Sequence, residues 1–249
     1  PYQPSSGCAG NIYFIDLDKL VDEGLLEKEE ILGYNWGTDE SEIDYAALHQ
    51  NRCKILQKAF ERFDTNAQEF QDFVKKQSEW LEQYALFMTL KTDNLYKNWS
   101  EWPSEYRNTQ TVALEKYQKK NYNTITFWKF CQYKFFEQWE DLKNYANSKG
   151  IYIIGDISFY VGYDSVDVWA ERQLFMMSAN DTPEYVAAAG PDKYSESGQV
   201  WGNPMYEWNA MKEDNFSWWR KRMRVCRELF DIVRIDHFAG IVKAYAVPY

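Results

Sequence analysis

Positive charge is in the minority in this sequence. It holds 28 Lys and Arg against 38 Asp and Glu, which gives a formal net charge of −10 at pH 7. Binding to nucleic acid or to an anionic membrane surface requires cations that neutralise phosphates, so the balance argues against both partners. A neutral or cationic ligand fits the charge better.

Paired cysteines and long apolar runs are also missing. The four cysteines lie far apart, without a CxxC pair, at Cys8, Cys53, Cys131 and Cys226. They are predicted to be reduced, mostly buried thiols of a cytoplasmic protein, with no redox role. No apolar run is long enough to cross a membrane and no charged-then-apolar leader is present, so no membrane association is predicted.

A calcium-binding loop is excluded by a missing glycine. The acidic run Asp16-Leu17-Asp18 resembles the start of such a loop, but Val21 stands at the sixth position, where that loop requires glycine. Heptads and internal repeats are absent as well, which excludes a coiled coil and a solenoid.

Aromatic residues are abundant. The 249 residues are 45% apolar and include 11 Trp, 19 Tyr and 15 Phe. A chain of this size can form one barrel-sized domain or two ordinary ones. About three-quarters of the aromatics are predicted to be core, and the remainder suit the C–H faces of sugars or a partner protein.

The first segment, residues 1–45, is predicted to hold a loop, a strand and a first helix. Pro1 to Asn11 is rich in Pro, Ser and Gly, and Ile12 to Ile15 is short and β-prone. Apolar residues at helical spacing follow, with Asp18 as the expected helix cap.

Residues 46–149 are predicted to be helical. Apolar residues recur every three or four positions, and Pro103 and Asn121 interrupt the pattern. Both a helical insertion within a barrel and an independent helical domain fit this segment.

Residues 150–249 are predicted to contain two helix–strand units that each present an Asp. Gly150 is placed to end a helix, and Ile151 to Ile154 reads as a strand buried on both faces that leads to Asp156. A second helical pattern precedes a strand over 231–238, which carries Asp236. This repetition predicts an α/β fold that is part of a (β/α)8 TIM-type barrel with a helical insertion subdomain.

The carboxyl end of the second strand is a position typical of catalytic residues. In parallel barrels the reacting side chains lie at the carboxyl ends of the strands. Arg234 stands two residues before Asp236, on the same face of the strand, and is expected to keep that carboxylate ionised and aimed. The competing interpretation is an ion pair that only stabilises the end of the strand.

Residues 190–206 are predicted to form a substrate loop. The segment is dense in Gly, Ser, Asn and Pro, yet it carries Trp201. The tryptophan alone could equally be an anchor that packs the loop down. Gln199 and Asn203 favour a binding role, because sugar hydroxyls require paired donors and acceptors beside an apolar platform.

Five strings carry a resemblance to a known family. In chain order they are PYQ, GNIYFIDLDKLVDEGLL, GDISFYVGYDSVDVW, YSESGQVWGNPMYEW and VRIDHFAG. Together they resemble the amylomaltases, the 4-α-glucanotransferases also called disproportionating enzyme, of the α-amylase superfamily. The resemblance runs from Pro1 to Tyr249, and its last two strings are the most specific.

The resemblance implies a retaining transglycosylase that acts on α-1,4-glucans and maltooligosaccharides without a metal or an organic cofactor. Asp236 matches the nucleophile, which forms a covalent glycosyl intermediate that another sugar's 4-hydroxyl resolves. Arg234 matches the residue that orients it. The implied substrate-binding residues are Tyr2, Asp156, Asp192, Gln199, Trp201, Asn203 and His237.

The sequence also departs from the family pattern. Ser158 replaces a usual Pro, Gly190-Pro191 replaces a double proline, and Ala239 replaces a usual Arg. Tyr249 comes about a dozen residues after Asp236, before the strands that should carry the general-acid Glu and a third carboxylate. The chain is therefore expected to be a partial sequence that is inactive by itself.

Three functions fit these residues. The first is a cytoplasmic 4-α-glucanotransferase. The alternative from a different class is a non-catalytic α-glucan-binding protein, which a Glu on a strand beyond Tyr249 would argue against. The third is a glucan hydrolase, which would release reducing sugar without lengthening an acceptor. The oligomeric state is not predicted.

Overall fold

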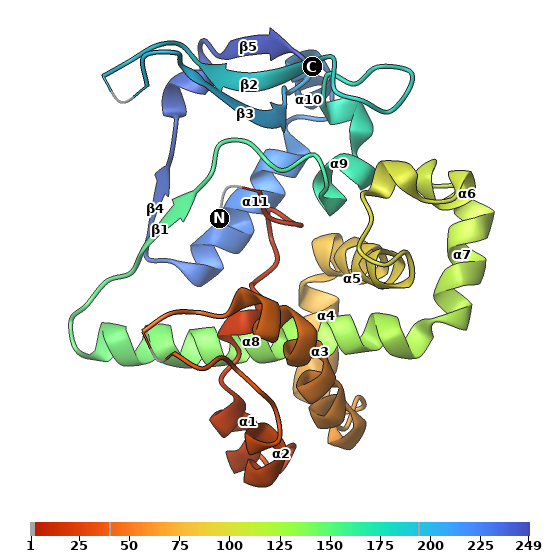
Figure 1. The fold of residues 1–249 in the computed structure, drawn as a ribbon, viewed down its shortest axis with the longest axis vertical. Coiled ribbons are helices and arrows are strands. Elements are labelled where there is room, and N and C mark those ends of the chain that lie inside the picture. The colour runs from red at the N-terminus through yellow and green to blue at the C-terminus, as the bar shows by residue number, and fades with distance from the viewer. Residues whose placement is uncertain (1–2, 40, 194) are drawn as a thin grey trace.

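The computed structural model is a mixed α/β fold, and it describes residues 3–39, 41–193 and 195–249. Long helices fill one part of the molecule, and two small sheets lie beyond them (Figure 1). Tyr2, one of the predicted binding residues, lies outside the described residues.

The N-terminal segment contains no strand among its described residues, so the predicted strand over Ile12 to Ile15 is wrong. A 3-10 turn, η1 (Ile12–Phe14), forms instead, because the Asn11 side chain accepts the Tyr13 N–H at 3.0 Å and starts a turn. Two short helices follow, α1 (Leu17–Asp22) and α2 (Lys28–Leu32). The cap of α1 is Asp16 rather than Asp18, since Asp16 Oδ1 accepts the Asp18 N–H at 2.9 Å.

Residues 45–148 are helical, as predicted. The elements are α3 (Tyr45–Arg62), α4 (Gln68–Lys76), α5 (Ser78–Asp93), η2 (Trp99–Glu101), α6 (Ser104–Arg107), α7 (Thr111–Lys120) and α8 (Tyr122–Ser148). Pro103 is the N-cap of α6, and Asn121 separates α7 from α8. Proline and asparagine interrupt the pattern because neither continues a helix well.

Two glutamines of α8 fix the N-terminal loop to the helical part. The side-chain amide of Gln132 accepts the Gly10 N–H at 2.8 Å and donates to the Gly10 carbonyl at 3.0 Å. Gln138 makes the same pair with Asp16, at 2.7 and 3.1 Å. Both glutamines are buried, so each replaces the water that would otherwise satisfy a loop peptide.

The C-terminal part carries the strands. Its elements are β1 (Ile154–Ile157), α9 (Val166–Ala170), η3 (Arg172–Leu174), β2 (Tyr185–Ala189), β3 (Gln199–Pro204), α10 (Trp208–Glu213), α11 (Ser217–Leu229), β4 (Ile232–Ile235), η4 (Phe238–Ile241) and β5 (Tyr245–Pro248). Helix α8 leads into β1 and α11 into β4, so both predicted helix–strand units are present. Gly150, at φ +75°, follows the last turn of α8, as expected for a helix end.

Strands β1 and β4 pair in parallel, with Asp156 opposite Arg234. The buried face includes Gly155, which lies so close to the Phe230 ring that a Cβ would be 2.1 Å from it. The other face is open: Ile154 is 64% exposed and Ile232 52%. The prediction of a strand buried on both faces is therefore wrong for this chain, and β1 begins at Ile154, later than predicted.

The second sheet is antiparallel, in the order β3-β2-β5. It corrects the prediction of a loop over 190–206, because β3 occupies Gln199 to Pro204 and pairs with β2 as a hairpin. Gly198 closes the turn at φ +75°, where a Cβ would lie 2.5 Å from the Ala189 carbonyl oxygen. The strand predicted over 231–238 is also shorter than expected, since β4 ends at Ile235.

One continuous cluster of buried residues joins all parts of the chain, from Cys8 to Val225. Its largest fully buried side chains include Trp99, Phe70, Phe87 and Phe130, which confirms that many aromatics are core. All four cysteines are free and three are buried, as predicted. The division at 45 and 149 into separate units remains a prediction.

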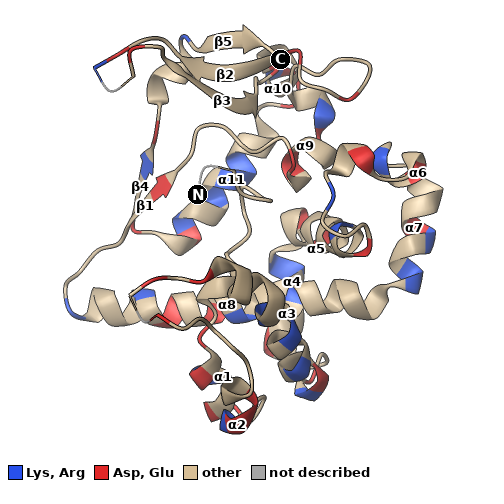
Figure 2. Cartoon of the chain, viewed as in Figure 1, with Lys and Arg blue, Asp and Glu red and all other residues tan. Residues whose placement is uncertain are grey.

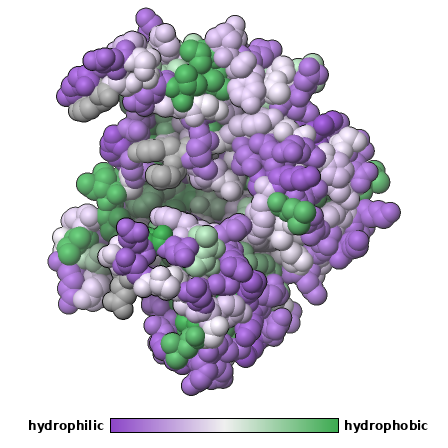
Figure 3. All heavy atoms as spheres, in the orientation of Figure 1, coloured by the Kyte–Doolittle hydropathy of each residue, from purple (hydrophilic) through white to green (hydrophobic). Residues whose placement is uncertain are grey.

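The surface is strongly charged, and α1 and α2 are mainly acidic (Figure 2). Within the described ranges, no helix is both long and apolar enough to cross a membrane. Hydrophobic atoms also reach the surface around a hollow on one face (Figure 3). The exposed side chains that precede and enter β1 include Ile151, Tyr152 and Ile154.

Candidate functional site

Arg234 joins two carboxylates at the open face of the parallel pair. Its Nη1 donates to Asp156 Oδ1 at 2.6 Å, and its Nη2 donates to Asp236 Oδ1 at 2.5 Å. The register places Asp156 opposite Arg234, and Asp236 directly follows β4, where its N–H donates to the Ile157 carbonyl at 3.1 Å. Figure 2 shows the acidic segment of β1 beside the basic segment of β4. The three predicted residues are therefore brought together.

The ion pairs of this triad are open to solvent. The side chains of Arg234, Asp156 and Asp236 are 56%, 42% and 36% exposed. The hydrogen bonds that the Arg234 guanidinium donates to Asp156 and Asp236 raise its pKa above the ordinary value. Exposed ion pairs add little to stability, so this arrangement is better suited to orienting carboxylates than to holding the fold.

His237 lies against aromatic rings beside the triad. It adopts the left-handed conformation at φ 50°, which turns the chain sharply after Asp236. Its ring centroid is 5.0 Å from that of Trp201 and 6.1 Å from that of Tyr160. The His237 Nε2 atom is buried and makes no hydrogen bond to any described residue. The structure thus brings His237 and Trp201 together, although Trp201 belongs to β3 and His237 follows β4.

Trp201 is held by two glutamine side chains. Its Nε1 donates to Gln199 Oε1 at 3.0 Å, and Gln3 Nε2 donates to the Trp201 carbonyl at 3.0 Å. Gln199 therefore lies beside Trp201 on β3. The contact from Gln3 attaches the N-terminal segment to the same strand.

Two other predicted residues have local roles in this structure. Asn203 is only 4% exposed, and its Nδ2 donates to the Val161 carbonyl at 2.8 Å, so its side chain fastens β3 to the segment after β1. Asp192 lies in the exposed turn between β2 and β3, where its Oδ1 accepts the Ser195 N–H at 2.8 Å. The triad is not linked to either side chain by these bonds.

Tyr160 is a site residue that the sequence did not single out. Its ring centroid is 6.2 Å from that of Trp201, and its buried hydroxyl makes no hydrogen bond within the described residues. Burial raises the pKa of Tyr160 to about 12. The available signal was its position in the loop that follows β1, the strand that carries Asp156.

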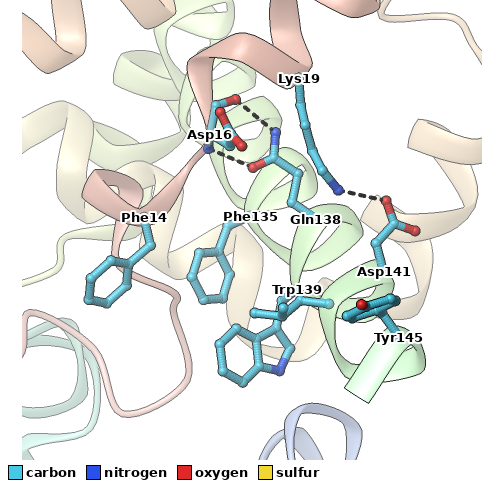
Figure 4. A pocket seen from close by; sticks show the side chains of 9 residues that line it. Phe14, Asp16, Lys19, Phe135, Gln138, Trp139, Asp141 and Tyr145 are labelled. Carbon is cyan, nitrogen blue, oxygen red and sulfur yellow. Dashed lines mark hydrogen bonds and ion pairs between the residues drawn. The ribbon is translucent and has the colours of Figure 1, made fainter. Parts of the chain in front are cut away.

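A cavity of about 680 Å³ lies elsewhere, between α1 and the C-terminal half of α8. Figure 4 shows Phe14, Phe135 and Trp139 on its wall, with Lys19 bound to Asp141 on its rim. None of its lining residues belongs to the triad or to the Trp201–His237 pair. Across the described ranges, no group of three or more His, Cys, Asp and Glu is arranged to hold a metal ion.

The site can therefore bind a polyhydroxylated ligand. Carboxylates accept hydrogen bonds from hydroxyls, and aromatic rings pack against apolar ring faces. A carboxylate fixed by a guanidinium at a strand end is also a suitable nucleophile. The geometry is suited to glycosyl chemistry.

The chain is similar to known proteins over its whole length. The 4-α-glucanotransferase family model matches residues 1–249. The 4-α-glucanotransferase of Clostridium butyricum is 40% identical over 251 residues, and that of Streptococcus pneumoniae (strain TIGR4) is 42% identical over 253 residues. Both matches cover 100% of this chain but only 52% and 50% of the relatives, so the chain spans about half the length of these curated relatives.

A solved structure shows the same fold. The amylomaltase from Streptococcus agalactiae in complex with acarbose is 36% identical, with a TM-score of 0.93 over 100% of this chain and 51% of that one. The mixed α/β architecture therefore matches about half of that amylomaltase. Since the family model covers the whole sequence, this chain belongs to the 4-α-glucanotransferase family.

Proposed function

We propose that the full-length protein containing this chain is a 4-α-glucanotransferase that transfers segments of α-1,4-glucan to a new 4-hydroxyl acceptor. The observation that carries the proposal is the triad, in which Arg234 fixes Asp156 and Asp236 at the end of β4. The family match and the amylomaltase fold support it. Maltooligosaccharides serve as both donor and acceptor.

In this mechanism Asp236 is the nucleophile. One of its oxygens attacks the anomeric carbon, the glycosidic C–O bond breaks, and the departing 4-oxygen takes a proton from a general acid. The 4-hydroxyl of a second glucan then displaces Asp236 and returns its proton to the same group. Arg234 leaves the second Asp236 oxygen available to attack, because its Nη2 donates to Oδ1.

The general acid is proposed to lie in the part of the full-length protein outside this chain. A retaining mechanism needs a protonated carboxyl about 5 Å from the nucleophile. Asp156 is unsuited to that role, because it accepts a hydrogen bond from the same guanidinium that holds Asp236. The double length of the relatives leaves room for such a residue.

The remaining predicted residues are proposed to bind sugar. Asp156 accepts from a substrate hydroxyl, His237 contacts the sugar at the cleavage point, and Tyr2 forms the platform beneath it. Trp201 and Gln199 cover the bound glucan and limit the access of water, which favours transfer over hydrolysis. Asp192 also accepts from a substrate hydroxyl, and Asn203, which fixes β3 to the Val161 carbonyl, binds sugar from the same hairpin.

We further propose that the fold is part of a (β/α)8 barrel with a helical insertion over 46–149. The parallel β1–β4 pair, each strand preceded by a helix, supports it. The open face of the pair supports it too, because parallel sheets are normally covered on both faces. A cytoplasmic location is proposed from the four free thiols.

The test is an incubation of the full-length protein with maltotriose and separation of the products by length. Transfer gives glucose together with maltopentaose and longer oligomers. Asp236→Asn should remove the longer products, while the matched control Asp141→Asn, on the α1–α8 rim, should keep them. Glucan binding without new products would instead support a binding protein, and reducing sugar without longer products would support a hydrolase.

A further inference from the structure

Two buried charged residues lie beneath the site and take no part in the chemistry proposed above. Asp167 of α9 is 7% exposed and Arg222 of α11 is 3% exposed. Both flank Gly7, where a Cβ would lie 3.1 Å from Arg222 Nε and 3.5 Å from Asp167 Oδ1. Ionised side chains are rarely buried so completely, because burial removes their hydration.

Asp167 anchors the N-terminal segment. Its Oδ2 accepts the Gly7 N–H at 2.7 Å, and its Oδ1 accepts the Trp218 Nε1–H at 2.9 Å. The neighbouring Val166 N–H also donates to the Ser5 carbonyl at 2.9 Å. This segment then reaches the site, because Gln3 donates to the Trp201 carbonyl.

Arg222 anchors the loop after β1. Its Nη1 donates to the Phe159 carbonyl at 3.3 Å and its Nη2 to Ser158 Oγ at 3.2 Å. The Ser158 hydroxyl in turn donates to the Tyr160 carbonyl at 2.9 Å. The guanidinium carbon lies 5.4 and 5.5 Å from the ring centroids of Trp218 and Trp219, which adds cation–π attraction.

Tyr206 extends this support to the strand that carries Trp201. Its hydroxyl donates to the same Phe159 carbonyl at 2.5 Å, and its ring stacks on that of Tyr160 with centroids 5.7 Å apart. Tyr160 itself lies against His237 and Trp201. Both anchored segments therefore end at the same pair of site residues.

We propose that Asp167 and Arg222 are positioning residues of the glucan site: the buried pair holds the segment Gln3–Gly7 and the loop Ser158–Tyr160 in register with His237 and Trp201. In this chain Ser158 supplies the hydroxyl that Arg222 binds, so a hydrogen bond fixes the loop. The activity readout of the proposal rests on the proposed function, whereas its structural readout does not.

The test compares variants in the full-length protein. Arg222→Met, Asp167→Asn and Ser158→Ala weaken or remove the contacts that Asp167 and Arg222 make with the two segments. The matched control is Lys134→Met, because Lys134 is also buried, at 4% exposure, and is paired with Glu23 and Glu137 in the helical part. Hydrogen exchange of residues 3–8, 158–161 and 199–204 is measured, together with kcat and KM for transfer from maltotriose, at equal distance below each variant's Tm.

Arg222→Met and Asp167→Asn should raise exchange in these segments and lower kcat/KM by about 10- to 100-fold, since small misplacements of binding groups have effects of that size. Ser158→Ala should shift both quantities in the same direction by less, and it serves if Arg222→Met fails to fold. Lys134→Met should change neither quantity at matched temperature.

The proposal is overturned if Lys134→Met and the pair variants behave alike, because the pair would then serve stability only. It is also overturned if exchange in the named segments is unchanged in Ser158→Ala and Asp167→Asn. A wild-type protein that makes no transfer products would refute the proposed function, and the exchange data would still decide the positioning role.

Discussion

The indole of Trp201 meets the imidazole of His237 edge to face, with ring centroids 5.0 Å apart and planes at 89°. Trp201 belongs to β3 of the antiparallel sheet and His237 follows the parallel pair, so this contact joins β3 to the turn after Asp236. Five predictions follow from this contact and from others in the structure.

Replacement of Trp201 should weaken transfer more than hydrolysis. An aromatic pair contributes about 0.5–1.5 kcal/mol beyond burial, so Trp201→Ala should reduce transfer by up to about tenfold. Trp201→Phe keeps a ring and should lose less. The ratio of maltopentaose to free glucose formed from maltotriose measures the effect, and Trp36→Phe, in the N-terminal part, is the control. An unchanged ratio in Trp201→Ala would contradict the role of the indole as a cover.

Arg234→Lys should lower activity without a matching loss of stability. The lysine amine is a point charge that lacks the planar fork, so it cannot hold Asp156 and Asp236 at once in the same geometry. A loss of about 100-fold in kcat/KM is expected, whereas Tm should change little because the triad is exposed. Arg224→Lys, in the exposed pair with Glu79, is the control and should change neither quantity. A large fall in Tm for Arg234→Lys would indicate a structural ion pair instead.

Gly10→Ala should destabilise the protein. A Cβ at Gly10 would lie 2.0 Å from the ring of the buried Phe135, so the ring or the loop must shift to admit it. Overpacking of this kind costs about 1–3 kcal/mol of unfolding free energy. Gly33→Ala is the control, since its nearest atoms are 3.5 Å away and its φ is −71°. Equal urea midpoints for the two variants would show that the loop adjusts.

The ion pair of Glu30 should contribute stability that depends on pH. Hydrogen bonds from Arg62, and then from the Glu27 N–H, lower the pKa of Glu30 from 4.5 to about 2. A lowered folded-state pKa means that the contribution is present above pH 4.5 and is lost as the pH falls toward 2. The unfolding free energy of wild type minus that of Glu30→Gln should therefore shrink between pH 5 and pH 2.5. A difference for Glu30→Gln that stays flat over this range would refute the prediction.

Residues 1–249 expressed alone should expose an apolar surface that promotes self-association. Ile151, Tyr152, Ile154 and Ile232 are each more than half exposed, at the open face of the parallel pair. This chain should bind an apolar dye and self-associate, while the full-length protein should do neither. Ile154→Lys and Ile232→Lys together should reduce self-association, and Val112→Lys, on the exposed helix α7, should not. If the wild-type chain is monomeric and binds no dye, the open face is stable without another segment to cover it.

The candidate site was partly readable from the sequence. Asp236 and Arg234 could be located because a helical pattern, a short β-prone run and an alternating Arg-x-Asp are all local signals, and β4 indeed ends directly before Asp236. The pairing of Asp156 with Arg234 was not readable, because it depends on the register of two strands far apart in the chain. Tyr160 was missed for the same reason: its neighbours Trp201 and His237 come from other elements.

The sequence by itself determined the helices, the order of the two helix–strand units and the motifs that identify the family. Periodicity and motifs are properties of neighbouring residues, so they can be read without the tertiary structure. Tertiary structure decided the rest. Ile12 to Ile15 forms a turn because Asn11 caps it and Gln132 and Gln138 hold the flanking peptides, and no nearby strand competes for them among the described residues. Asp167 and Arg222 are buried because three separated segments close over them, which no local pattern of charge could indicate.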